Sequence, residues 1–433
     1  MTVTPPTASG RIASVDALRG LTILLMVFVN DLGPAAPAWL HHIQPADADG
    51  MTLADIVFPF FLFIAGVSVP LSMHAARQRG SATPQILGHI LLRTSALLTM
   101  GLIAVNRSAE TVLGPALWGL LAYMACICTW SVAPRDTGVR RTMMQVVKFA
   151  GVLGLLALLA VYRREPVETT VLFRGTVTDW VWLKTSWWGI LGLIAWAWLL
   201  TAVTYLLVGN RREFLLAAVG LCMLNFLVAR HGGFFARTAD KSWLAGAQPV
   251  LDLMEQFVAG VNSYVDLGTQ LGSLPAITMS GCVLGTILLP DSDTASARQR
   301  IRWALIYASG LFLAGAMTDT FAGINKIAAT PTWCFWCAAL ATLTWLFLYV
   351  LMDVFQFTKW SILIRPAGAN PLLAFLLHPI ILFVLQLTQS GGTLRAYAAA
   401  DSAAVVLAGS FGMAVVVCAL TSLLGRLGLR MRV

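Results

Sequence analysis

The chain has 433 residues, of which 58% belong to the set AVILMFWYC and only 11% are charged. Ordinary soluble domains carry about 25% charged residues and need polar side chains to cover their surface. This composition excludes a soluble globular enzyme, a disordered protein and a fibrous protein, and it predicts that lipid surrounds most of the chain. The net charge of +9 comes from basic residues in short clusters between apolar runs, which indicates membrane topology rather than nucleic-acid binding.

Apolar runs long enough to cross a bilayer follow one another along the whole chain, and each predicts a transmembrane helix. They cover residues 16–31, 53–73, 86–105, 113–133, 143–162, 188–208, 214–230, 268–289, 302–323, 332–354, 367–388 and 402–424. The runs are continuous rather than alternating, which excludes an outer-membrane β-barrel. We therefore predict an all-α polytopic membrane protein of about 12 helices, in a single integral-membrane domain over residues 1–433.

The distribution of Lys and Arg predicts the orientation of these helices. With both termini in the cytoplasm, the denser basic clusters fall inside, among them Arg77 with Arg79, Arg140 with Arg141, and Arg211 with Arg212. Residues 1–10 lack a basic segment, and no small-residue cleavage site follows the first apolar run. We therefore expect the first helix to be retained rather than removed as a signal peptide.

Three of the predicted outer loops are long, at residues 32–52, 163–187 and 231–267. The first loop holds His41 and His42. The second holds four tryptophans that are typical of an interfacial aromatic belt: Trp180, Trp182, Trp187 and Trp188. The third has a helical pattern at residues 250–261, and we expect that helix to lie on the membrane surface.

Ionisable side chains inside a bilayer cost about 2.5–3.5 kcal/mol each on insertion scales, so each one needs an explanation. Asp16 and Arg19 are one helical turn apart near the inner start of the first helix. They form either an ion pair that caps this helix or, through Arg19, a site for the phosphate of a cytoplasmic ligand. Arg93 lies too deep in the third helix to reach the interface. It requires an anionic ligand or an acidic partner such as Asp353 or Asp55, and His89 lies one turn earlier on the same face.

Other polar residues gather toward the outer face. Asn30 and Asp31 end the first helix, His41 and His42 follow in the loop, and Asp55 opens the second helix. Taken singly, each has an ordinary reading, because loop histidines are usually solvated and a carboxylate in the first turn suits the helix dipole. Together they predict a polar cluster between two adjacent helices. His378, followed by a proline in the middle of a run, either satisfies the break in that helix or belongs to the same site.

Several motifs resemble one known family. Ser14-Val-Asp-Ala-Leu-Arg-Gly-Leu-Thr, and the block Asp49-Gly-Met-Thr-Leu-Ala-Asp-Ile-Val-Phe-Pro-Phe-Phe-Leu-Phe-Ile-Ala-Gly66, resemble the opening of the heparan-α-glucosaminide N-acetyltransferase family, which includes bacterial NagX-like transmembrane acetyltransferases. Weaker matches follow at Arg93 to Asn106, at Gly323-Ile-Asn-Lys326 and at Pro366-Ala-Gly-Ala-Asn-Pro371. Residues 11–122, 266–355 and 366–380 carry the resemblance.

The resemblance implies a transmembrane acyltransferase-like fold and transfer of an acetyl group across a bacterial inner membrane. The donor would be cytoplasmic acetyl-CoA, and the acceptor a periplasmic amino sugar of the glucosamine type or the end of a glycan. No metal is expected, and a homodimer is left open. Two other functions remain open: a sugar permease of the N-acetylglucosamine type, and an O-acyltransferase acting on an envelope glycan.

The resemblance also implies roles for individual residues. His42 is the preferred catalytic histidine because Ile43 follows it as an apolar residue does in the family pattern, and His41 is the alternative. Asn30 would bind the oxyanion or orient the acceptor, and Asp55 would orient the histidine. Donor-binding candidates are Arg19, Arg93, Asp16, His89 and Asn370. Substrate-binding candidates are Asp31, Asn325, Lys326 and His378. Two departures stand out: the His41 to Gly50 stretch is longer than the family pattern and lacks its Trp, and residues 143–230 hold extra spans.

Overall fold

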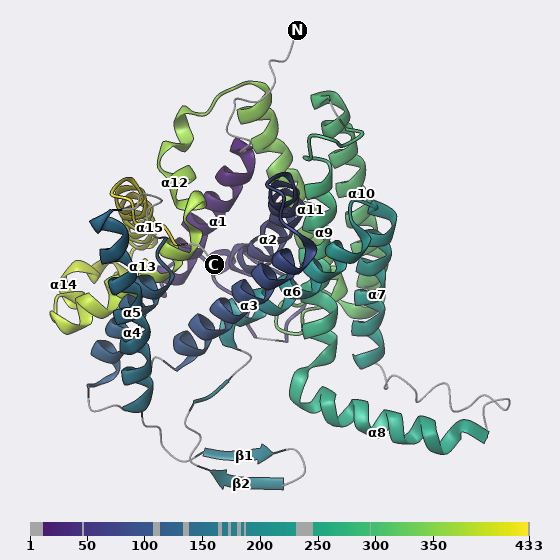
Figure 1. Ribbon diagram of the computed structural model, residues 1–433, viewed down its shortest axis with the longest axis horizontal. Coiled ribbons are helices and arrows are strands. Elements are labelled where there is room, and N and C mark those ends of the chain that lie inside the picture. Colours follow the sequence, from purple (N-terminus) through teal and green to yellow (C-terminus); the bar gives the residue numbers. More distant parts are fainter. Residues whose placement is uncertain are drawn as a thin grey trace.

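The computed structural model describes most of the chain, namely residues 12–45, 47–106, 113–132, 138–162, 167–171, 175–179, 183–185, 188–230, 246–294 and 296–431. Residues 1–10, which supported the expectation that the first helix is retained, lie outside the described residues. So do Trp180, Trp182 and Trp187 of the expected aromatic belt. Helices make up almost all of the described part (Figure 1).

The α-helices follow one another through the chain. They are α1 (Ala13–Asp31), α2 (Leu53–Gln78), α3 (Thr83–Val105), α4 (Pro115–Trp130), α5 (Val139–Ala160), α6 (Gly189–Val208), α7 (Arg212–Arg230), α8 (Gln248–Val265), α9 (Leu274–Thr286), α10 (Ala297–Ala322), α11 (Pro331–Tyr349), α12 (Ile364–Ala369), α13 (Pro371–Leu387), α14 (Gly391–Leu394) and α15 (Ala403–Arg426). Short 3-10 and π-helical turns join them: η1 (Ala38–Leu40), η4 (Thr269–Ser273), η5 (Val350–Val354), η6 (Lys359–Ile362) and η7 (Ala396–Ala399).

The length and composition of these helices confirm the prediction of an all-α polytopic membrane protein. Within the described ranges, nine helices are long and apolar enough to cross a membrane: α1, α2, α3, α5, α6, α7, α10, α11 and α15. Two shorter apolar helices, α4 and α13, match two further predicted spans. The remaining span is α9, which continues directly from the π-helical turn η4. Each predicted apolar run therefore corresponds to one helix.

The segment between α5 and α6 contains structure that the search for apolar runs did not predict. Strands β1 (Val167–Val171) and β2 (Gly175–Asp179) pair antiparallel as a hairpin. Their sequences, Val-Glu-Thr-Thr-Val and Gly-Thr-Val-Thr-Asp, are rich in β-branched residues, which favour strands. A search for long apolar runs passes over such short polar strands, so the hairpin was missed.

The expected surface helix is present as α8, which lies beyond the end of the bundle and across the direction of α7 and α9 (Figure 1). Its exposed apolar residues, Val250, Leu253, Met254 and Phe257, follow helical spacing along one face. This arrangement is typical of a helix in the plane of a membrane interface. We call the end of the bundle where α8 lies, where α1 ends and where α2 begins, the α8 face. The opposite end is the N-terminal face.

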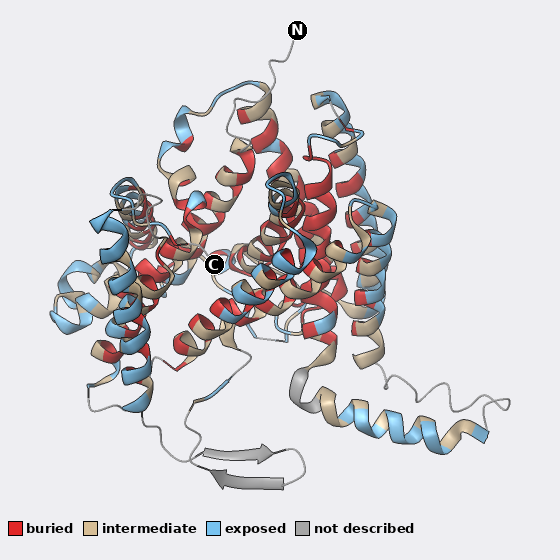
Figure 2. Ribbon diagram, in the orientation of Figure 1, coloured by how far each residue is buried: buried red, intermediate tan, exposed pale blue. Residues whose placement is uncertain are grey.

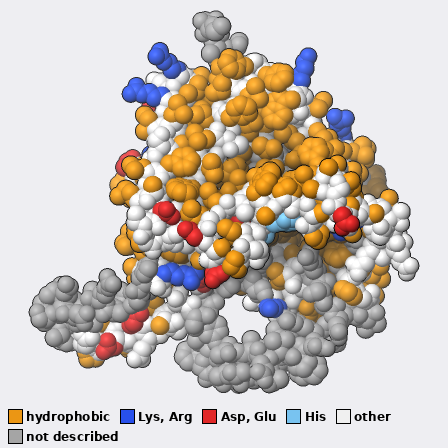
Figure 3. All heavy atoms as spheres, turned by 180° about the vertical axis from the view of Figure 1, so that it is seen from behind, with side chains coloured by type: hydrophobic (Ala, Val, Ile, Leu, Met, Phe, Trp, Pro, Cys, Tyr) orange, Lys and Arg blue, Asp and Glu red, His pale blue; other side chains and the backbone are white. Residues whose placement is uncertain are grey.

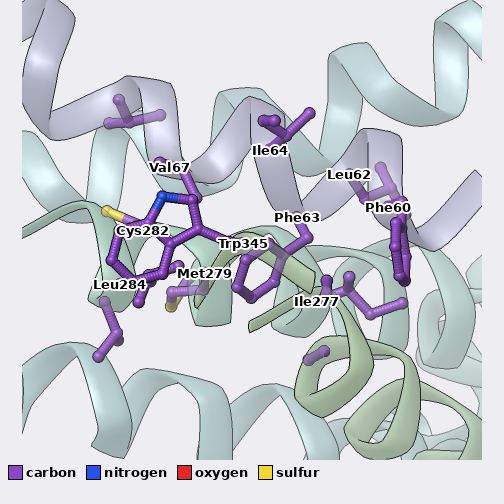
Figure 4. Close-up of a cluster of buried hydrophobic side chains, with 14 of the residues drawn as sticks. Phe60, Leu62, Phe63, Ile64, Val67, Ile277, Met279, Cys282, Leu284 and Trp345 are labelled. Atoms are coloured by element: carbon purple, nitrogen blue, oxygen red, sulfur yellow. The ribbon is translucent and has the colours of Figure 1, made fainter. Parts of the chain in front are cut away.

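Helices α2 and α9 form the centre of the bundle. A Cβ atom added to Gly66 would come within 1.7 Å of the carbonyl oxygen of Thr278, and one added to Gly281 within 1.9 Å of that of Phe63. Glycine at both positions is therefore what permits the two backbones to touch, as small residues do in other membrane helix pairs. Buried apolar side chains surround this contact, including Trp345 from α11 (Figure 4).

A second close contact joins α1 to α12. A Cβ on Gly20 would come within 2.0 Å of the carbonyl oxygen of Ile364, and one on Gly368 within 2.0 Å of that of Asp16. A separate cluster of buried apolar side chains from α1, α3, α4, α13 and α15 supports this half of the molecule. The contact fixes the first turns of α1 beside α12, where Asp16 and Arg19 lie.

The outer surface of the bundle is apolar over a broad band. Buried side chains concentrate in the centre, whereas large apolar side chains on α5, α10 and α15 are exposed (Figure 2). The space-filling view shows a broad region of apolar side chains on one face of the molecule, with Lys and Arg side chains standing along its upper rim (Figure 3). A soluble monomer rarely exposes so large an apolar surface, so this band is the surface that lipid covers.

Candidate active site

The carboxylate of Asp55 is the centre of a polar cluster at the α8 face. Asp55 stands in the first turn of α2, where Thr52 is the N-cap residue. Its Oδ2 accepts hydrogen bonds from the backbone N–H of Thr52 at 3.0 Å and from the backbone N–H of Ile43 at 3.2 Å, and the Thr52 hydroxyl oxygen lies 3.0 Å from it. The side chain is only 1% exposed. The local sequence therefore holds this carboxylate rigidly, with Oδ1 left for another partner.

That partner is His42, whose Nδ1 lies 2.8 Å from Oδ1 of Asp55. An ionised carboxylate can only accept a hydrogen bond, so the ring carries its hydrogen on Nδ1 and presents Nε2 as an acceptor. The His42 side chain is 49% exposed. The pair thus combines a buried carboxylate with an accessible imidazole nitrogen, the arrangement that orients a histidine for proton transfer.

The structure distinguishes His42 from its neighbour His41. The backbone carbonyl of His41 accepts a hydrogen bond from the Thr52 hydroxyl. Its ring Nε2 is buried and has no hydrogen-bond partner in the described part of the chain. Asp55 therefore pairs with His42, the histidine preferred from the sequence, and His41 supports the loop through its backbone.

Lys326 completes the cluster from the loop between α10 and α11. Its Nζ lies 3.3 Å from Nε2 and 3.0 Å from Nδ1 of His42, and 3.7 Å from Oδ1 of Asp55. Because these two distances to the ring nitrogens are nearly equal, the Lys326 amine stands over the face of the imidazole. Nε2 remains the ring nitrogen that can accept a hydrogen bond, since Nδ1 donates to Asp55. Burial lowers the pKa of Lys326, while the nearby Asp55 carboxylate opposes part of that effect.

Asn325 holds the Lys326 loop against the His42 loop. Its side-chain amide donates to the carbonyl of Ala48 at 3.0 Å, and its side-chain oxygen accepts from the N–H of Ala328 at 2.7 Å. The backbone of Ile324 bonds to both Asp49 and Gly50. Asn325, expected from the sequence to bind substrate, is thus buried and serves to join the two loops, while Lys326 reaches the site itself.

Asp31 belongs to a second cluster at the end of α1. Its carboxylate accepts from the Arg395 guanidinium at 2.7 Å and from the Tyr397 hydroxyl at 2.5 Å. Nε2 of His378 lies 3.8 Å from the same carboxylate, and its imidazole is almost fully buried. Burial raises the pKa of Tyr397 to about 12, and the hydrogen bond to Asp31 adds to this rise. Two of the predicted substrate-binding residues, Asp31 and His378, are therefore brought together here.

The polar residues expected to form one outer cluster are divided between two. Asp31 is engaged by Arg395, whereas Asp55 is engaged by His42. Asn30 is exposed near the end of α1, and its side chain forms no hydrogen bond with either cluster. Sequence reasoning missed Arg395 and Tyr397, because they are more than 360 residues from Asp31 and no local pattern links them.

A cavity of about 270 Å³ opens within the bundle on the N-terminal side of these clusters. Its walls come from α1, α2, α3, α6 and the start of α13, with Phe61, Ile64, Leu97 and Phe375 among its apolar lining. Two guanidinium groups, Arg19 and Arg93, line it as well. A mostly apolar cavity with two converging cations is suited to a ligand that has an apolar part and an anionic or strongly polar part.

Arg19 is held in place by its surroundings. Its guanidinium donates to Asp16 at 3.0 Å, to the carbonyl of Gly368 at 3.1 Å and to the Ser68 hydroxyl at 2.8 Å. Both sequence-based readings of this pair therefore have support, because Asp16 and Arg19 form an ion pair while Arg19 also lines the cavity. Asp16 acts as the residue that positions Arg19.

Arg93 differs because no acidic group in the described ranges pairs with it. Its guanidinium lies over the Trp198 ring, with Cζ 4.5 Å from the ring centroid, and its Nε is buried without a hydrogen-bond partner. The two acidic partners considered from the sequence are used elsewhere: Asp353 accepts from the N–H of Ser14, and Asp55 binds His42. A buried guanidinium with an unused donor favours a ligand over a structural ion pair.

The two other predicted donor-binding residues do not line the cavity. His89 is exposed on α3, although it stands one turn before Arg93. Asn370 is buried, its amide donates to the carbonyl of Leu429 at 3.0 Å, and its side-chain oxygen accepts from the N–H of Met431 at 3.1 Å. Asn370 thereby anchors the C-terminal segment, which brings Met431 to the cavity wall.

These features define a polytopic membrane protein with a histidine–carboxylate pair at one face and a cavity lined by two arginines inside the bundle. Residues 11–230 match the family described as "Domain of unknown function (DUF5009)". This match covers half of the chain, and the chain belongs to that family.

The chain is also similar to two named relatives. It is 43% identical over 108 residues to heparan-alpha-glucosaminide N-acetyltransferase of Homo sapiens, a match covering 25% of this chain and 15% of the human protein. It is 40% identical over 111 residues to the protein of the same name from Mus musculus, covering 26% of this chain and 16% of the mouse protein. The resemblance recognised from the motifs is thus confirmed, over a limited part of each chain.

Proposed function

We propose that this protein is a transmembrane acetyltransferase. It would transfer an acetyl group from acetyl-CoA, bound from the N-terminal face, to the amine of a glucosamine-type sugar at the α8 face. The observation that carries the proposal is the Asp55–His42 pair, which presents an accessible imidazole nitrogen beside a buried carboxylate. The two relatives are named as N-acetyltransferases, which is the same reaction class.

The transfer follows from the geometry of His42. The amine nitrogen of the acceptor attacks the acetyl carbonyl carbon, and the bond from that carbon to the thiol sulfur of coenzyme A breaks. Nε2 of His42 takes the proton that the amine loses, and the buried Asp55 carboxylate stabilises the resulting imidazolium through Nδ1. The thiolate that leaves then takes up a proton. In an alternative route, Nε2 first accepts the acetyl group itself and passes it on to the amine.

The donor fits the cavity in chemical character. Coenzyme A combines several negative charges with a long, mostly uncharged pantetheine arm. The cavity offers apolar walls, the Arg19 guanidinium and the unpartnered Nε of Arg93. Its volume of about 270 Å³ is below the usual range of about 300–1,000 Å³ for ligand pockets, so it would hold one section of the donor. The remaining charged part would stay near the N-terminal face.

We further propose that the N-terminal face is cytoplasmic and that both termini lie there, in the inner membrane of a bacterium. Basic clusters lie at this face, near Arg77, Arg140, Arg211 and Arg298. Positively charged loops are retained on the cytoplasmic side of a membrane. Acetyl-CoA is a cytoplasmic metabolite that cannot cross lipid. The Asp55–His42 pair would then face the periplasm.

A second candidate is O-acetylation of an envelope glycan. A histidine oriented by a carboxylate deprotonates a hydroxyl in the same way as an amine, so the Asp55–His42 pair supports both reactions. The two differ in the acceptor atom alone. N-acetylglucosamine, which has hydroxyls but no free amine, separates them when it is compared with glucosamine.

The test uses purified protein in lipid nanodiscs with labelled acetyl-CoA. Glucosamine, N-acetylglucosamine and buffer alone serve as acceptor conditions, and both thiol release and labelled product are measured. The proposal expects label on the glucosamine amine, with the signal lost in His42→Ala. Label on N-acetylglucosamine alone would move the assignment to O-acetylation. In a parallel assay with the protein reconstituted into sealed vesicles, uptake of N-acetylglucosamine without any thiol release would show a permease instead.

A further inference from the structure

We propose that Lys326 is an internal acetyl acceptor, so that the protein acetylates its own Lys326 when no external amine is present. The proposal rests on the proposed acetyltransferase function and adds a modification site to it. It starts from the position of one amine. Nζ of Lys326 lies 3.3 Å from Nε2 of His42, the nitrogen that receives the acceptor's proton.

The position of Nζ is next to the one that an acceptor amine must occupy. Nζ lies 3.0 Å from Nδ1 and 3.3 Å from Nε2 of His42, so it stands over the ring, and rotation about the Lys326 side-chain bonds brings it into line with Nε2. An amine that gives its proton to His42 has to lie within hydrogen-bond distance of Nε2, about 2.6–3.2 Å from it in a reacting complex. Lys326 already places a primary amine at the edge of that distance. Any acetyl group positioned for attack by a sugar amine at His42 is therefore within reach of Nζ as well.

The loop that carries Lys326 is fixed rather than free to swing away. Asn325 bonds to Ala48, and the Ile324 backbone bonds to Asp49 and Gly50 on the opposite loop. The side chain of Lys326 is 22% exposed, so its amine is partly buried but still open to the site. Holding a nucleophile in place in this way raises its effective concentration at the reacting carbon.

The amine must be neutral to attack, and its surroundings favour that form. Burial lowers the pKa of Lys326, although the Asp55 carboxylate acts in the opposite direction. Lysines that act as nucleophiles in proteins are activated by the same kind of desolvation. His42 supplies the base that the attacking nitrogen needs, and Asp55 holds that base in its accepting tautomer.

The reaction is a simple acyl transfer from an acyl thioester. The lone pair of the neutral Nζ forms a bond to the acetyl carbonyl carbon, and the carbon–sulfur bond breaks. Nε2 of His42 takes the proton released by the nitrogen, and the leaving thiolate of coenzyme A takes up a proton. The products are Nζ-acetyl-lysine at position 326 and free coenzyme A, with no change of oxidation state.

The modified side chain would change the site. An acetylated Lys326 carries no positive charge and can no longer interact with the Asp55 carboxylate as a cation. It would also occupy the volume beside Nε2. Because Lys326 and a sugar amine compete for one base, saturating glucosamine should protect Lys326 from acetylation.

The experiment incubates the purified full-length protein with labelled acetyl-CoA, without acceptor, and maps acetyl groups on all lysines by peptide mass spectrometry. Lys184, which is exposed in the described segment 183–185, serves as the internal control for uncatalysed acetylation. We expect acetylation at Lys326 well above that at Lys184. The His42→Ala variant should slow it by about 10²–10⁴-fold, the usual effect of removing a general base. Lys326→Arg keeps the positive charge but lacks the amine that is acetylated, so the corresponding peptide should carry no acetyl group.

Each outcome separates this inference from the proposed function. If glucosamine is acetylated but Lys326 is modified no faster than Lys184, the inference is wrong and the proposed function stands. Equal labelling of Lys326 in wild type and His42→Ala would identify background chemistry and also overturn it. If neither glucosamine nor Lys326 is acetylated, both are wrong. Labelling of Lys326 that glucosamine suppresses supports both.

Discussion

Asp55 and His42 are 13 residues apart in the chain, and their side chains meet with Oδ1 2.8 Å from Nδ1. The two groups differ sharply in exposure, since the carboxylate is 1% exposed and the imidazole 49%. The buried member is held by backbone N–H donors from Thr52 and Ile43. The accessible member is thereby left with one defined orientation and with Nε2 as the nitrogen that Asp55 does not engage, beside the Lys326 amine.

The first prediction concerns the two adjacent histidines. His42→Ala should lower acetyl transfer by about 10²–10⁴-fold, because it removes the proposed base, and should leave acetyl-CoA binding near wild type. His41→Ala is the matched control, because the role of His41 in the loop is carried by its backbone carbonyl. Turnover and donor affinity are measured for both variants. Full activity in His42→Ala with loss in His41→Ala would reverse the assignment.

The second prediction separates the orienting role of Asp55 from its role in holding α2. Asp55→Asn keeps the size of the side chain and one oxygen acceptor, but it removes the charge that stabilises the His42 imidazolium. We expect kcat to fall with little change in donor binding. Asp55→Ala should additionally destabilise the fold by about 1–3 kcal/mol, because buried donors lose their acceptor. Thermal stability and kcat are measured together, and an Asn variant with wild-type kcat contradicts the orienting role.

Sequence reasoning reached the His42–Asp55 pair because His42 lies on the loop between α1 and α2 and Asp55 lies in the first turn of α2. Local order along the chain was enough, since Asp55 is the N-terminal carboxylate of α2 and the histidines directly precede that helix. Helix positions were likewise predictable, because long apolar runs in lipid have few alternatives to helix. Asn30 was expected in the same cluster, but its exposed side chain forms no hydrogen bond with Asp55 or His42, since proximity in sequence does not fix the direction of a side chain.

Contacts between distant segments were beyond such reasoning. Lys326 stands 284 residues after His42, and Arg395 stands 364 residues after Asp31. The packing of α11 and α13 against the first two helices brings them together. The partner of Arg93 was unpredictable for the same reason, because a single sequence cannot show that Trp198 and a cavity face it.

The third prediction tests the packing that supports both sites. Gly66→Ala should strongly reduce the yield of folded protein, because the new Cβ would stand 1.7 Å from the Thr278 carbonyl oxygen. The backbones of α2 and α9 would have to separate, and overpacking of this kind typically costs about 1–3 kcal/mol or more. Gly310→Ala on α10 is the control, since nothing lies within 4 Å of its Cβ position in the described structure. Size-exclusion profiles and thermal stability of the two variants provide the comparison.

The fourth prediction concerns the pH dependence of Lys326. Folding lowers its pKa by burial, so between the folded and unfolded values the unfolded chain binds more protons. The contribution of Lys326 to the free energy of unfolding therefore rises with pH across that interval. In labelling with an amine-reactive reagent, the midpoint of the pH profile at Lys326 should lie lower in the folded protein than in the denatured chain. Coincident midpoints in the two states would contradict the prediction.

The fifth prediction tests orientation. Asp47→Cys places a thiol in the loop at the α8 face, and Ala82→Cys places one in the exposed turn before α3 at the N-terminal face. In intact cells, an impermeant thiol reagent should label the Asp47→Cys variant and not the Ala82→Cys variant. The parent protein is the background control, because six of its seven cysteines are buried and Cys128 is partly buried. The opposite labelling pattern would invert the proposed topology, and with it the side from which the donor enters.

The last prediction concerns donor binding by Arg93. Its guanidinium lines the cavity, carries an unpartnered Nε, and pairs with no described acidic group. A hydrogen bond to a charged group contributes about 1.5–3 kcal/mol, and about 1.4 kcal/mol corresponds to a tenfold change in affinity. Arg93→Met should therefore weaken acetyl-CoA binding by about 10–100-fold, whereas folding should be maintained, because Met is apolar and leaves no buried charge. Arg93→Lys should recover part of the affinity.

The control for charge alone is Arg300→Met. Arg300 donates to the carbonyl of Thr294 in the turn before α10 and does not line the cavity, so its loss changes the net charge without touching the proposed donor site. The affinity of all three variants for acetyl-CoA is measured by isothermal titration calorimetry at two salt concentrations. Specific binding predicts that only the Arg93 variants lose affinity at both salt concentrations. Equal losses of affinity in Arg93→Met and Arg300→Met would show that Arg93 acts only through the overall positive charge of the protein and does not bind the donor directly. An unchanged affinity in Arg93→Met would place the donor outside this cavity.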